Sequence, residues 1–156
     1  MPDGLYERDA LAWSDQQAGL LRRIAAGERL NEAVDWANVI EEVQDVGRSE
    51  LRAVKGLLVQ ALVHLLKCHA WPGSGSAAHW RGELPGFLSG ARRSFSPSMR
   101  QWINLDDLYA DALYEMSAKV DDSGLPRSLP AVCPYGLDDL VAIRPDLAVL
   151  LTKLGM

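Results

Sequence analysis

Apolar residues recur every three or four positions along most of the chain, and no sustained alternation of apolar and polar residues occurs. The first pattern is the period of an α-helix with one buried face, whereas alternation would indicate a half-buried β-strand. The widest apolar face belongs to the segment 51–66, through Leu51, Val54, Leu58, Ala61, Leu62, Leu65 and Leu66. The pattern therefore predicts an all-α fold with this segment as its central helix.

Capping residues, glycines and prolines indicate where the expected helices begin and end. Asp35 and Ser96 are good N-cap residues, and Pro97 suits the first helical position after Ser96. Gly47 and Pro85 fall inside helical patterns, so we expect a break or a kink at each of them. Five main helices are expected over about residues 5–26, 35–46, 49–70, 76–94 and 97–123, with short helices over about 137–142 and 146–154.

These elements predict an irregular bundle of five main helices plus short C-terminal helices, built as a single domain over residues 1–156. Trp36 begins a second run of apolar residues at helical spacing, which continues through Val39, Ile40, Val43 and Val46. We therefore expect Trp36 and the segment 51–66 to lie together at the centre of one shared core.

The composition narrows the class of protein. Of the 156 residues, 48% are apolar and 24% are charged, which excludes a disordered chain, and two cysteines are too few for a disulfide scaffold. The N-terminus lacks a signal-peptide pattern, and the longest apolar-rich stretch, residues 57–66, is too short to cross a membrane. With Cys68 and Cys133 interpreted as free thiols, we expect a cytoplasmic protein without membrane contact.

The formal net charge of −5 makes nucleic acid an unfavourable partner, because affinity for nucleic acid comes mostly from neutralising its phosphates. The charge is unevenly distributed, since residues 31–50 carry −5 and residues 76–100 carry +3. The simpler interpretation is that the basic segment lies near acidic helices of the same molecule and orients the bundle. The alternative is an arginine patch for an anionic ligand or an RNA segment.

A set of motifs extends over most of the chain. The motifs are Tyr6-Glu7-Arg8-Asp9 with Trp13, Asp35-Trp36 with Asn38, Glu41-Glu42-Val43, Val46-Gly47-Arg48-Ser49-Glu50, His64-Leu65-Leu66-Lys67, Trp80, Tyr109-Ala110-Asp111-Ala112 and Cys133-Pro134-Tyr135-Gly136-Leu137. Together they resemble the DUF29 family of small bacterial proteins over roughly residues 5–142. The resemblance implies an all-α bundle, and the helical segment over residues 143–156 departs from the family pattern as a C-terminal extension. It implies no activity, because the family has no established one.

Glu42, His64 and Lys67, together with Arg48, are the candidates for a catalytic site. Glu42 and His64 each lie at the edge of an apolar helix face. If the helices over 35–46 and 49–70 pack as neighbours, the Glu42 carboxylate meets the His64 imidazole and orients it for acid–base or metal chemistry. The alternative is a hydrogen bond between helices that sets the register of the bundle.

His64 and Cys68 are the candidates for metal ligands, because residues four apart leave the same face of a helix. No CxxC or HxxxH pattern supplies two further ligands, so we predict no metal ion and interpret Cys68 as a buried thiol. No cofactor is predicted either, since Gly73-Ser74-Gly75 follows a helix instead of a strand and lacks the lysine of a phosphate-binding loop.

Trp71 and Trp80 flank a loop rich in glycine and serine and are the candidate interface residues. An exposed tryptophan in a loop anchors a partner well. The alternative is that both side chains pack the loop onto the bundle.

Three functional hypotheses follow. The favoured one is a non-enzymatic interaction module that presents a helical face, or the loop near Trp71 and Trp80, to a protein partner or to a second copy of the chain as a homo-oligomer. The second is a small enzyme or metal-binding protein built on Glu42, His64 and Lys67. The third is an antitoxin-like protein that binds a toxin partner, which the size and acidity allow.

Overall fold

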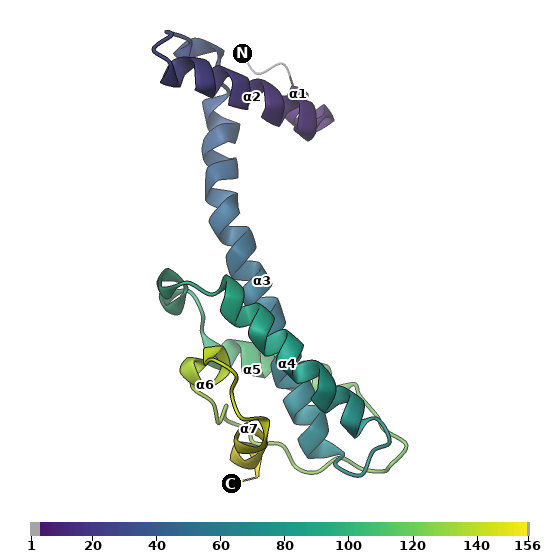
Figure 1. Ribbon diagram of the computed structural model, residues 1–156. Helices are drawn as coiled ribbons and strands as arrows, with labels where there is room; N and C mark the ends of the chain where they lie inside the picture. Colours follow the sequence, from purple (N-terminus) through teal and green to yellow (C-terminus); the bar gives the residue numbers. More distant parts are fainter. Residues whose placement is uncertain (1–3, 156) are drawn as a thin grey trace. The chain divides into compact units, whose positions relative to one another are not determined.

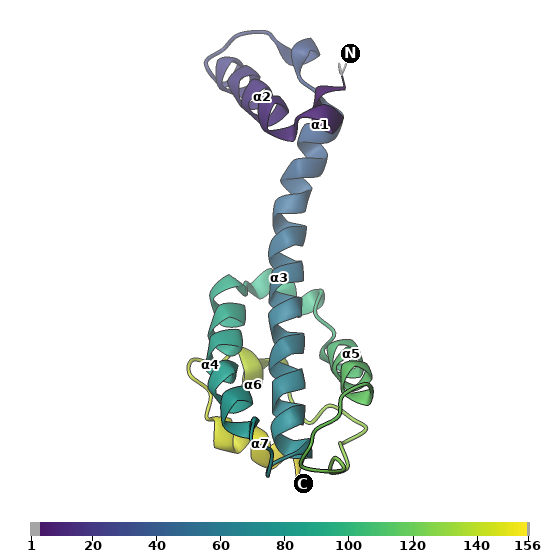
Figure 2. The same cartoon turned by 90° about the vertical axis from the view of Figure 1, so that its right-hand side faces the viewer.

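The computed structural model describes residues 4–155, which form helices joined by turns and loops with no β-strand among them (Figures 1 and 2). The prediction of an all-α fold is confirmed. Contacts divide the chain into two compact units, residues 1–48 and residues 49–156. The single domain expected over residues 1–156 stays a prediction. No described helix combines the length and the apolar character needed to cross a membrane.

The N-terminal unit contains α1 (Leu5–Arg8), α2 (Ala10–Ala25), the 3-10 helix η1 (Asn31–Ala33) and the first turns of α3 (Trp36–Ala70). One helix was predicted over residues 5–26, but Asp9 leaves the helical conformation, with φ −155° and ψ 85°, and divides it. The Asp9 carboxylate accepts a hydrogen bond from the Ala12 backbone N–H at 3.0 Å and so caps α2. Gly27 follows the end of α2 at φ 99°, as its predicted role as helix stop requires.

Trp13 forms the buried centre of this unit. Its indole N–H donates to the Asp35 carboxylate at 3.1 Å, and its ring meets the Tyr6 ring edge-on with centroids 4.9 Å apart. The buried Gln17 side chain accepts a hydrogen bond from the Asp35 backbone N–H at 2.8 Å. Polar contacts around one tryptophan therefore join α2 to the start of α3.

Helix α3 runs without interruption from Trp36 to Ala70, so of the break or kink predicted at Gly47 the break is absent. A single glycine inside a helix costs only about 1 kcal/mol relative to alanine and keeps its backbone hydrogen bonds. Consequently, the segments predicted as separate helices over 35–46 and 49–70 form one helical element.

The apolar face at the start of α3 is exposed, contrary to the prediction that Trp36 lies in the core. Trp36 is 43% exposed, Ile40 56%, Val43 70% and Val46 69%. The Trp36 indole donates one hydrogen bond, to the Asn31 carbonyl at 2.8 Å. Helical periodicity shows that one face is apolar, but it does not show whether another element covers that face.

The C-terminal unit is built on the second half of α3, and here the predicted core is confirmed. Its other elements are α4 (Ala77–Ser94), η2 (Pro97–Gln101), α5 (Leu105–Ser117), α6 (Leu137–Val141) and α7 (Leu147–Leu154). Figure 2 shows α4 and α5 flanking α3. The interior joins side chains of five helices, among them Val54, Leu58, Leu62, Leu65 and Leu66 of α3, Leu84 and Leu88 of α4, Tyr109 of α5, Leu140 of α6 and Leu150 of α7.

Two further expectations about helices need correction. Helix α4 continues through Pro85, so of the break or kink predicted there the break is absent. The segment predicted as one helix from Pro97 is the 3-10 helix η2 followed by α5, whose N-cap Asn104 accepts hydrogen bonds from the backbone N–H groups of Asp106 and Asp107 at 3.1 and 3.4 Å. The Ser96-Pro97 signal therefore starts a short turn, and a second, less obvious cap starts the longer helix. The two short C-terminal helices are confirmed.

Candidate functional site

His64 and Lys67, two of the four predicted site residues, belong to a polar cluster where α3 packs on α4. His64 is only 6% exposed, and the Phe87 ring lies edge-on to its imidazole at 4.8 Å. Its Nδ1 is 2.9 Å from the Gln60 carbonyl oxygen, and its Nε2 is 2.6 Å from Glu83 Oε2. Both ring nitrogens of His64 therefore have an oxygen partner within the protein, one from the backbone and one from a side chain.

Glu83 connects this buried histidine to a second one. Its Oε1 is 3.3 Å from Nε2 of His79, which lies one turn earlier on α4 and is exposed. The half-buried Glu83 carboxylate thus lies between a buried and an exposed imidazole. The carboxylate therefore links the helix contact at His64 to the surface of α4.

The Lys67 ammonium group contacts the ring of an aromatic side chain. Its Nζ lies 5.5 Å from the ring centroid of Trp80, which is the geometry of a cation–π contact. Burial lowers the pKa of Lys67, and the charge of Lys119 adds to this effect, while Glu83 and Glu115 oppose it. Lys67 therefore borders the cluster without donating a hydrogen bond to His64 or Glu83.

Glu42 does not join the cluster. It accepts a hydrogen bond from the Tyr6 hydroxyl at 2.6 Å within the N-terminal unit, and His64 has Glu83 as its carboxylate partner instead. The Glu42 hydrogen bond is the largest of the effects that raise the pKa of Tyr6 to about 12. The expected meeting of Glu42 and His64 required two neighbouring helices, and the chain forms one continuous helix there.

Arg48, the fourth predicted site residue, forms an exposed ion pair with Asp45 at 3.1 Å on the same helix. Sequence reasoning missed Glu83 and His79. Their spacing of four residues on an expected helix was a usable signal, because such residues are neighbours on the helix surface. Nothing in the sequence indicated that α4 would bring Glu83 to His64.

Several residues that carry the family resemblance contact one another in the N-terminal unit. Besides the pairs of Trp13 with Asp35 and of Tyr6 with Glu42, the Asn38 side chain donates to Asp35 at 2.8 Å. This hydrogen bond is the largest of the effects that lower the pKa of Asp35. The motif residues therefore hold α1, α2 and the start of α3 together, which is a structural role.

The proposed metal ligands His64 and Cys68 do not form a site together with other residues. Both His64 ring nitrogens already face protein oxygens, and Cys68 Sγ lies 4.0 Å from the Ala77 carbonyl oxygen. Burial raises the pKa of Cys68, which keeps it a neutral thiol near pH 7. Within residues 4–155, no group of three or more His, Cys, Asp or Glu side chains is placed to hold a metal ion. The absence of a metal stays a prediction.

The predicted interface residues are packed onto the bundle. Trp71 is 3% exposed, and its indole donates to the Gly124 carbonyl at 3.0 Å. Trp80 is half-buried, with its ring centroid 6.3 Å from that of Trp71. Trp71 thus follows the alternative in which the tryptophans pack the loop onto the bundle, while a role of Trp71 and Trp80 at an interface stays a prediction. The large exposed tryptophans are Trp36 and Trp102.

The fold and these clusters define an all-α helical protein with structural polar networks on its longest helix. Residues 5–144 match the family described as domain of unknown function DUF29, so the chain belongs to this family, as predicted. It is similar to an alpha-helical protein of unknown function from Rhodospirillum rubrum, with 26% sequence identity and a TM-score of 0.72 to its crystal structure. The match covers 97% of this chain and 98% of that chain. No curated protein matches.

Proposed function

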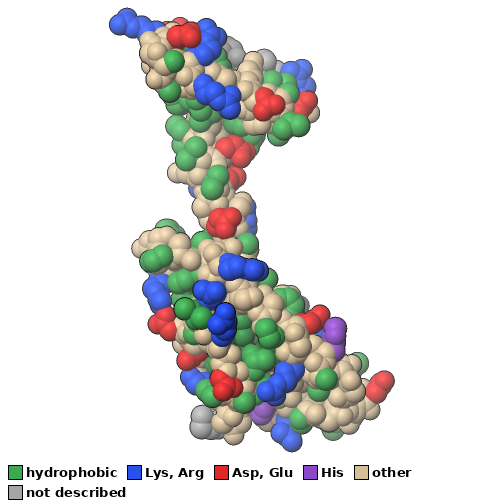
Figure 3. Space-filling model, viewed as in Figure 1, with side chains coloured by type: hydrophobic (Ala, Val, Ile, Leu, Met, Phe, Trp, Pro, Cys, Tyr) green, Lys and Arg blue, Asp and Glu red, His purple; other side chains and the backbone are tan. Residues whose placement is uncertain are grey.

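We propose that this protein is a non-enzymatic interaction module that binds a basic amphipathic helix of a partner protein on the exposed apolar face of α3. The observation that carries the proposal is the exposure of Trp36, Ile40, Val43 and Val46. Figure 3 shows hydrophobic side chains at the surface along this part of α3. Contiguous exposed apolar residues of this kind mark binding surfaces.

The shape of this face suits another helix. Successive helical residues turn by about 100°, so Trp36, Ile40, Val43 and Gly47 lie within about 60° of one another. A Cβ added at Gly47 would have nothing within 4 Å, so the backbone there is open to close approach. An apolar stripe with a small residue at its end is a docking surface for the apolar face of an amphipathic helix.

The distribution of charge over the two units distinguishes between the possible partners of this face. Residues 1–48 contain ten acidic residues against five arginines, whereas residues 49–156 contain eleven acidic and eleven basic residues. The entire net charge of −5 therefore belongs to the unit that carries the face. This field attracts a cationic helix and repels the same unit of a second copy.

The enzyme hypothesis has less support than the interaction module. Glu42, His64 and Lys67 would have to meet at a solvent-reachable pocket. Glu42 is bound to Tyr6 in the N-terminal unit, and His64 is buried against Phe87 in the C-terminal unit. A toxin-binding role is one special case of the interaction module. A cytoplasmic location belongs to the same proposal, supported by the free thiols of Cys68 and Cys133.

The test measures the affinity of the full chain for a synthetic amphipathic helix made of leucine and lysine, by titration calorimetry. We expect the double substitution Ile40→Asn and Val43→Asn to raise the dissociation constant at least about tenfold, because it removes two apolar side chains from the contact. The matched control is the double substitution Val120→Asn and Val132→Asn, which changes two exposed valines outside the face. It should leave the affinity unchanged.

Equal affinity of the wild type and the Ile40→Asn, Val43→Asn variant contradicts the proposal, as does equal binding of a peptide with glutamate in place of lysine. Analytical ultracentrifugation supplies the remaining comparison. A wild-type dimer that the same variant dissociates would assign the face to a second copy of the chain and overturn the basic helix as its occupant.

A further inference from the structure

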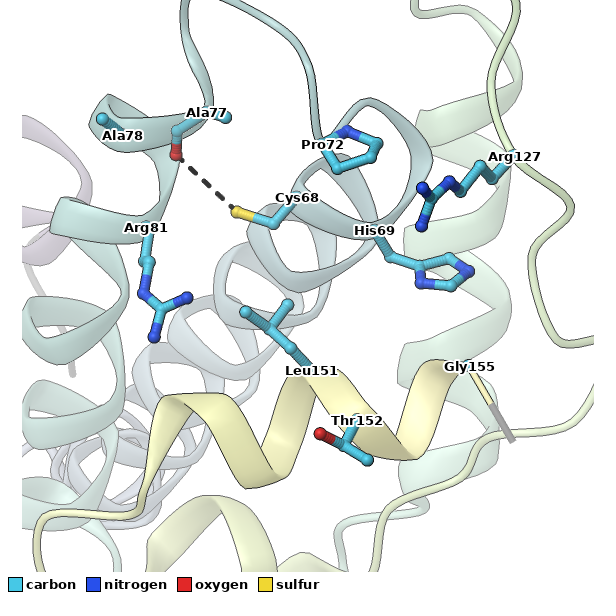
Figure 4. A pocket seen from close by; sticks show the side chains of 10 residues that line it. All are labelled: Cys68, His69, Pro72, Ala77, Ala78, Arg81, Arg127, Leu151, Thr152 and Gly155. Atoms are coloured by element: carbon cyan, nitrogen blue, oxygen red, sulfur yellow. Dashed lines mark hydrogen bonds between the residues drawn. The ribbon is translucent and has the colours of Figure 1, made fainter.

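A pocket of about 480 Å³ lies in the C-terminal unit among α3, α4 and α7 (Figure 4). Arg81 of α4 lines one side of it, and Arg127, from the connection between α5 and α6, lines the other side next to His69 of α3. None of the described residues that line the pocket carries a carboxylate.

Both arginines lack an acidic partner within the described part of the chain. Three other arginines do form ion pairs at 2.5–3.1 Å, namely Arg23 with Glu28, Arg48 with Asp45 and Arg100 with Asp138. The thiol of Cys68, which also lines the pocket, does not offset their charge, because burial raises its pKa more than the nearby Arg81 lowers it. The pocket is therefore a local centre of positive charge in an acidic protein.

The side of the pocket that carries Arg127 is fixed by the protein itself. The Arg127 backbone N–H donates to the Ala70 carbonyl at 2.9 Å, next to the hydrogen bond of Trp71 with Gly124. Further along the connection, the Tyr109 hydroxyl donates to the Pro130 carbonyl at 2.6 Å. These contacts position the backbone of Arg127 before any ligand arrives, so binding requires little ordering of the chain.

The other polar side chains that line the pocket already form hydrogen bonds with backbone carbonyl groups. His69 Nε2 is 3.3 Å from the Ser128 carbonyl oxygen, so this nitrogen donates and Nδ1 remains for a ligand. The Thr152 hydroxyl donates to the Ala148 carbonyl at 2.8 Å and keeps only its acceptor capacity. The charged donors left for a ligand are therefore the guanidinium groups of Arg81 and Arg127.

We propose that this pocket binds the phosphate group of a small phosphorylated metabolite. A guanidinium group donates two parallel hydrogen bonds to phosphate oxygens, and a phosphate carries more negative charge than a carboxylate, so it suits a pocket lined by Arg81 and Arg127. The volume falls in the range of small-molecule sites. Leu151 and Pro72 offer apolar surface to the rest of the ligand.

Binding of phenyl phosphate to the full chain, followed by NMR titration, tests the proposal. We expect saturable one-to-one binding with shift changes at His69 and Thr152. Arg81→Gln and Arg127→Gln should each raise the dissociation constant at least about tenfold, since each removes charged hydrogen bonds to the phosphate. The matched control Arg93→Gln removes one charge from the same helix at an exposed position that does not line the pocket, and it should change nothing.

Benzoate and inorganic phosphate separate the possible ligands. Benzoate has the same ring with a carboxylate, and weaker binding than phenyl phosphate supports the phosphate assignment. Equal or tighter binding of benzoate, or tighter binding of inorganic phosphate, overturns the metabolite proposed. Absence of saturable binding, or an equal loss in Arg93→Gln, overturns the site itself. None of these results bears on the interaction face of α3, because the leucine–lysine peptide tests that face separately.

Discussion

Glu83 shows how a single residue can complete the hydrogen bonding of a buried neighbour. The sequence identifies His64 as a polar residue at the edge of an apolar face, and it predicts Glu42 as the partner only if two neighbouring helices form. In the structure, the Glu83 carboxylate completes the hydrogen bonding of His64 and also contacts His79. Because buried polar atoms are costly when unpaired, the simplest role of this cluster is to join α4 to α3.

This role predicts different effects for two neighbouring substitutions. Glu83→Ala leaves the His64 Nε2–H buried without its acceptor, and we expect the free energy of unfolding to fall by about 1–3 kcal/mol. His79→Ala removes only an exposed contact of the same carboxylate and should cost less than about 0.5 kcal/mol. Urea denaturation of both variants measures the difference. Equal losses would mean that the cluster does not secure the helix contact through His64.

Glycine disfavours the helical conformation, and α3 and α4 contain glycines in different environments. Gly47 lies on the exposed apolar face, and its backbone remains helical. Gly90 on α4 is also helical, but a Cβ there would come within 3.2 Å of Leu57 Cδ1. The first glycine is therefore open on its outer side, whereas the second lets two helices pack closely.

The two glycines should respond differently to alanine. We expect Gly47→Ala to raise the free energy of unfolding by about 0.5–1 kcal/mol, because alanine restricts the unfolded chain and meets no neighbour in the helix. Gly90→Ala should give a smaller gain or a loss, since Leu57 has to move. Thermal and urea unfolding monitored by circular dichroism would reveal both effects. A destabilised Gly47→Ala protein would argue against a continuous α3.

At the scale of the whole molecule, carboxylates satisfied by hydrogen bonds occur in both units. Asn38 is the largest cause of the lowered pKa of Asp35, and Ser123 is the largest cause at Asp121. At Asp139, the backbone N–H of Gly136 has the largest lowering effect on the pKa. In each case the folded state favours the ionised form more strongly than the unfolded chain does.

These shifts predict how stability depends on pH. A carboxyl whose pKa is lower in the folded state contributes stability above its unfolded pKa and loses it as the pH falls towards its folded pKa. The free energy of unfolding should therefore decline as the pH is lowered from about 5 to 3. Urea denaturation across this range measures the decline, and Asp139→Asn should reduce its slope. A stability that rises towards pH 3 would contradict the prediction.

Short-range information in the sequence was sufficient for much of the fold. Helical periodicity located the core segment 51–66, and the Gly/Pro-rich stretch after Ala70 marked the end of α3. Such signals depend on neighbouring residues, whose spacing and backbone preferences act in any context. The cap at Asp9 was missed because it lies inside a longer helical pattern.

Other properties depend on residues that are far apart in the chain. The helical spacing of Trp36, Ile40 and Val43 predicts that they share one apolar face. Whether another helix covers that face depends on tertiary packing. The pairing of His64 with Glu83, and the arrangement of Arg81 opposite Arg127 in one pocket, likewise arise where distant segments meet. Sequence therefore sufficed for the kind of each element and for most of its apolar face. The partners of its polar groups were decided by tertiary packing, because burial and hydrogen bonding depend on which elements become neighbours.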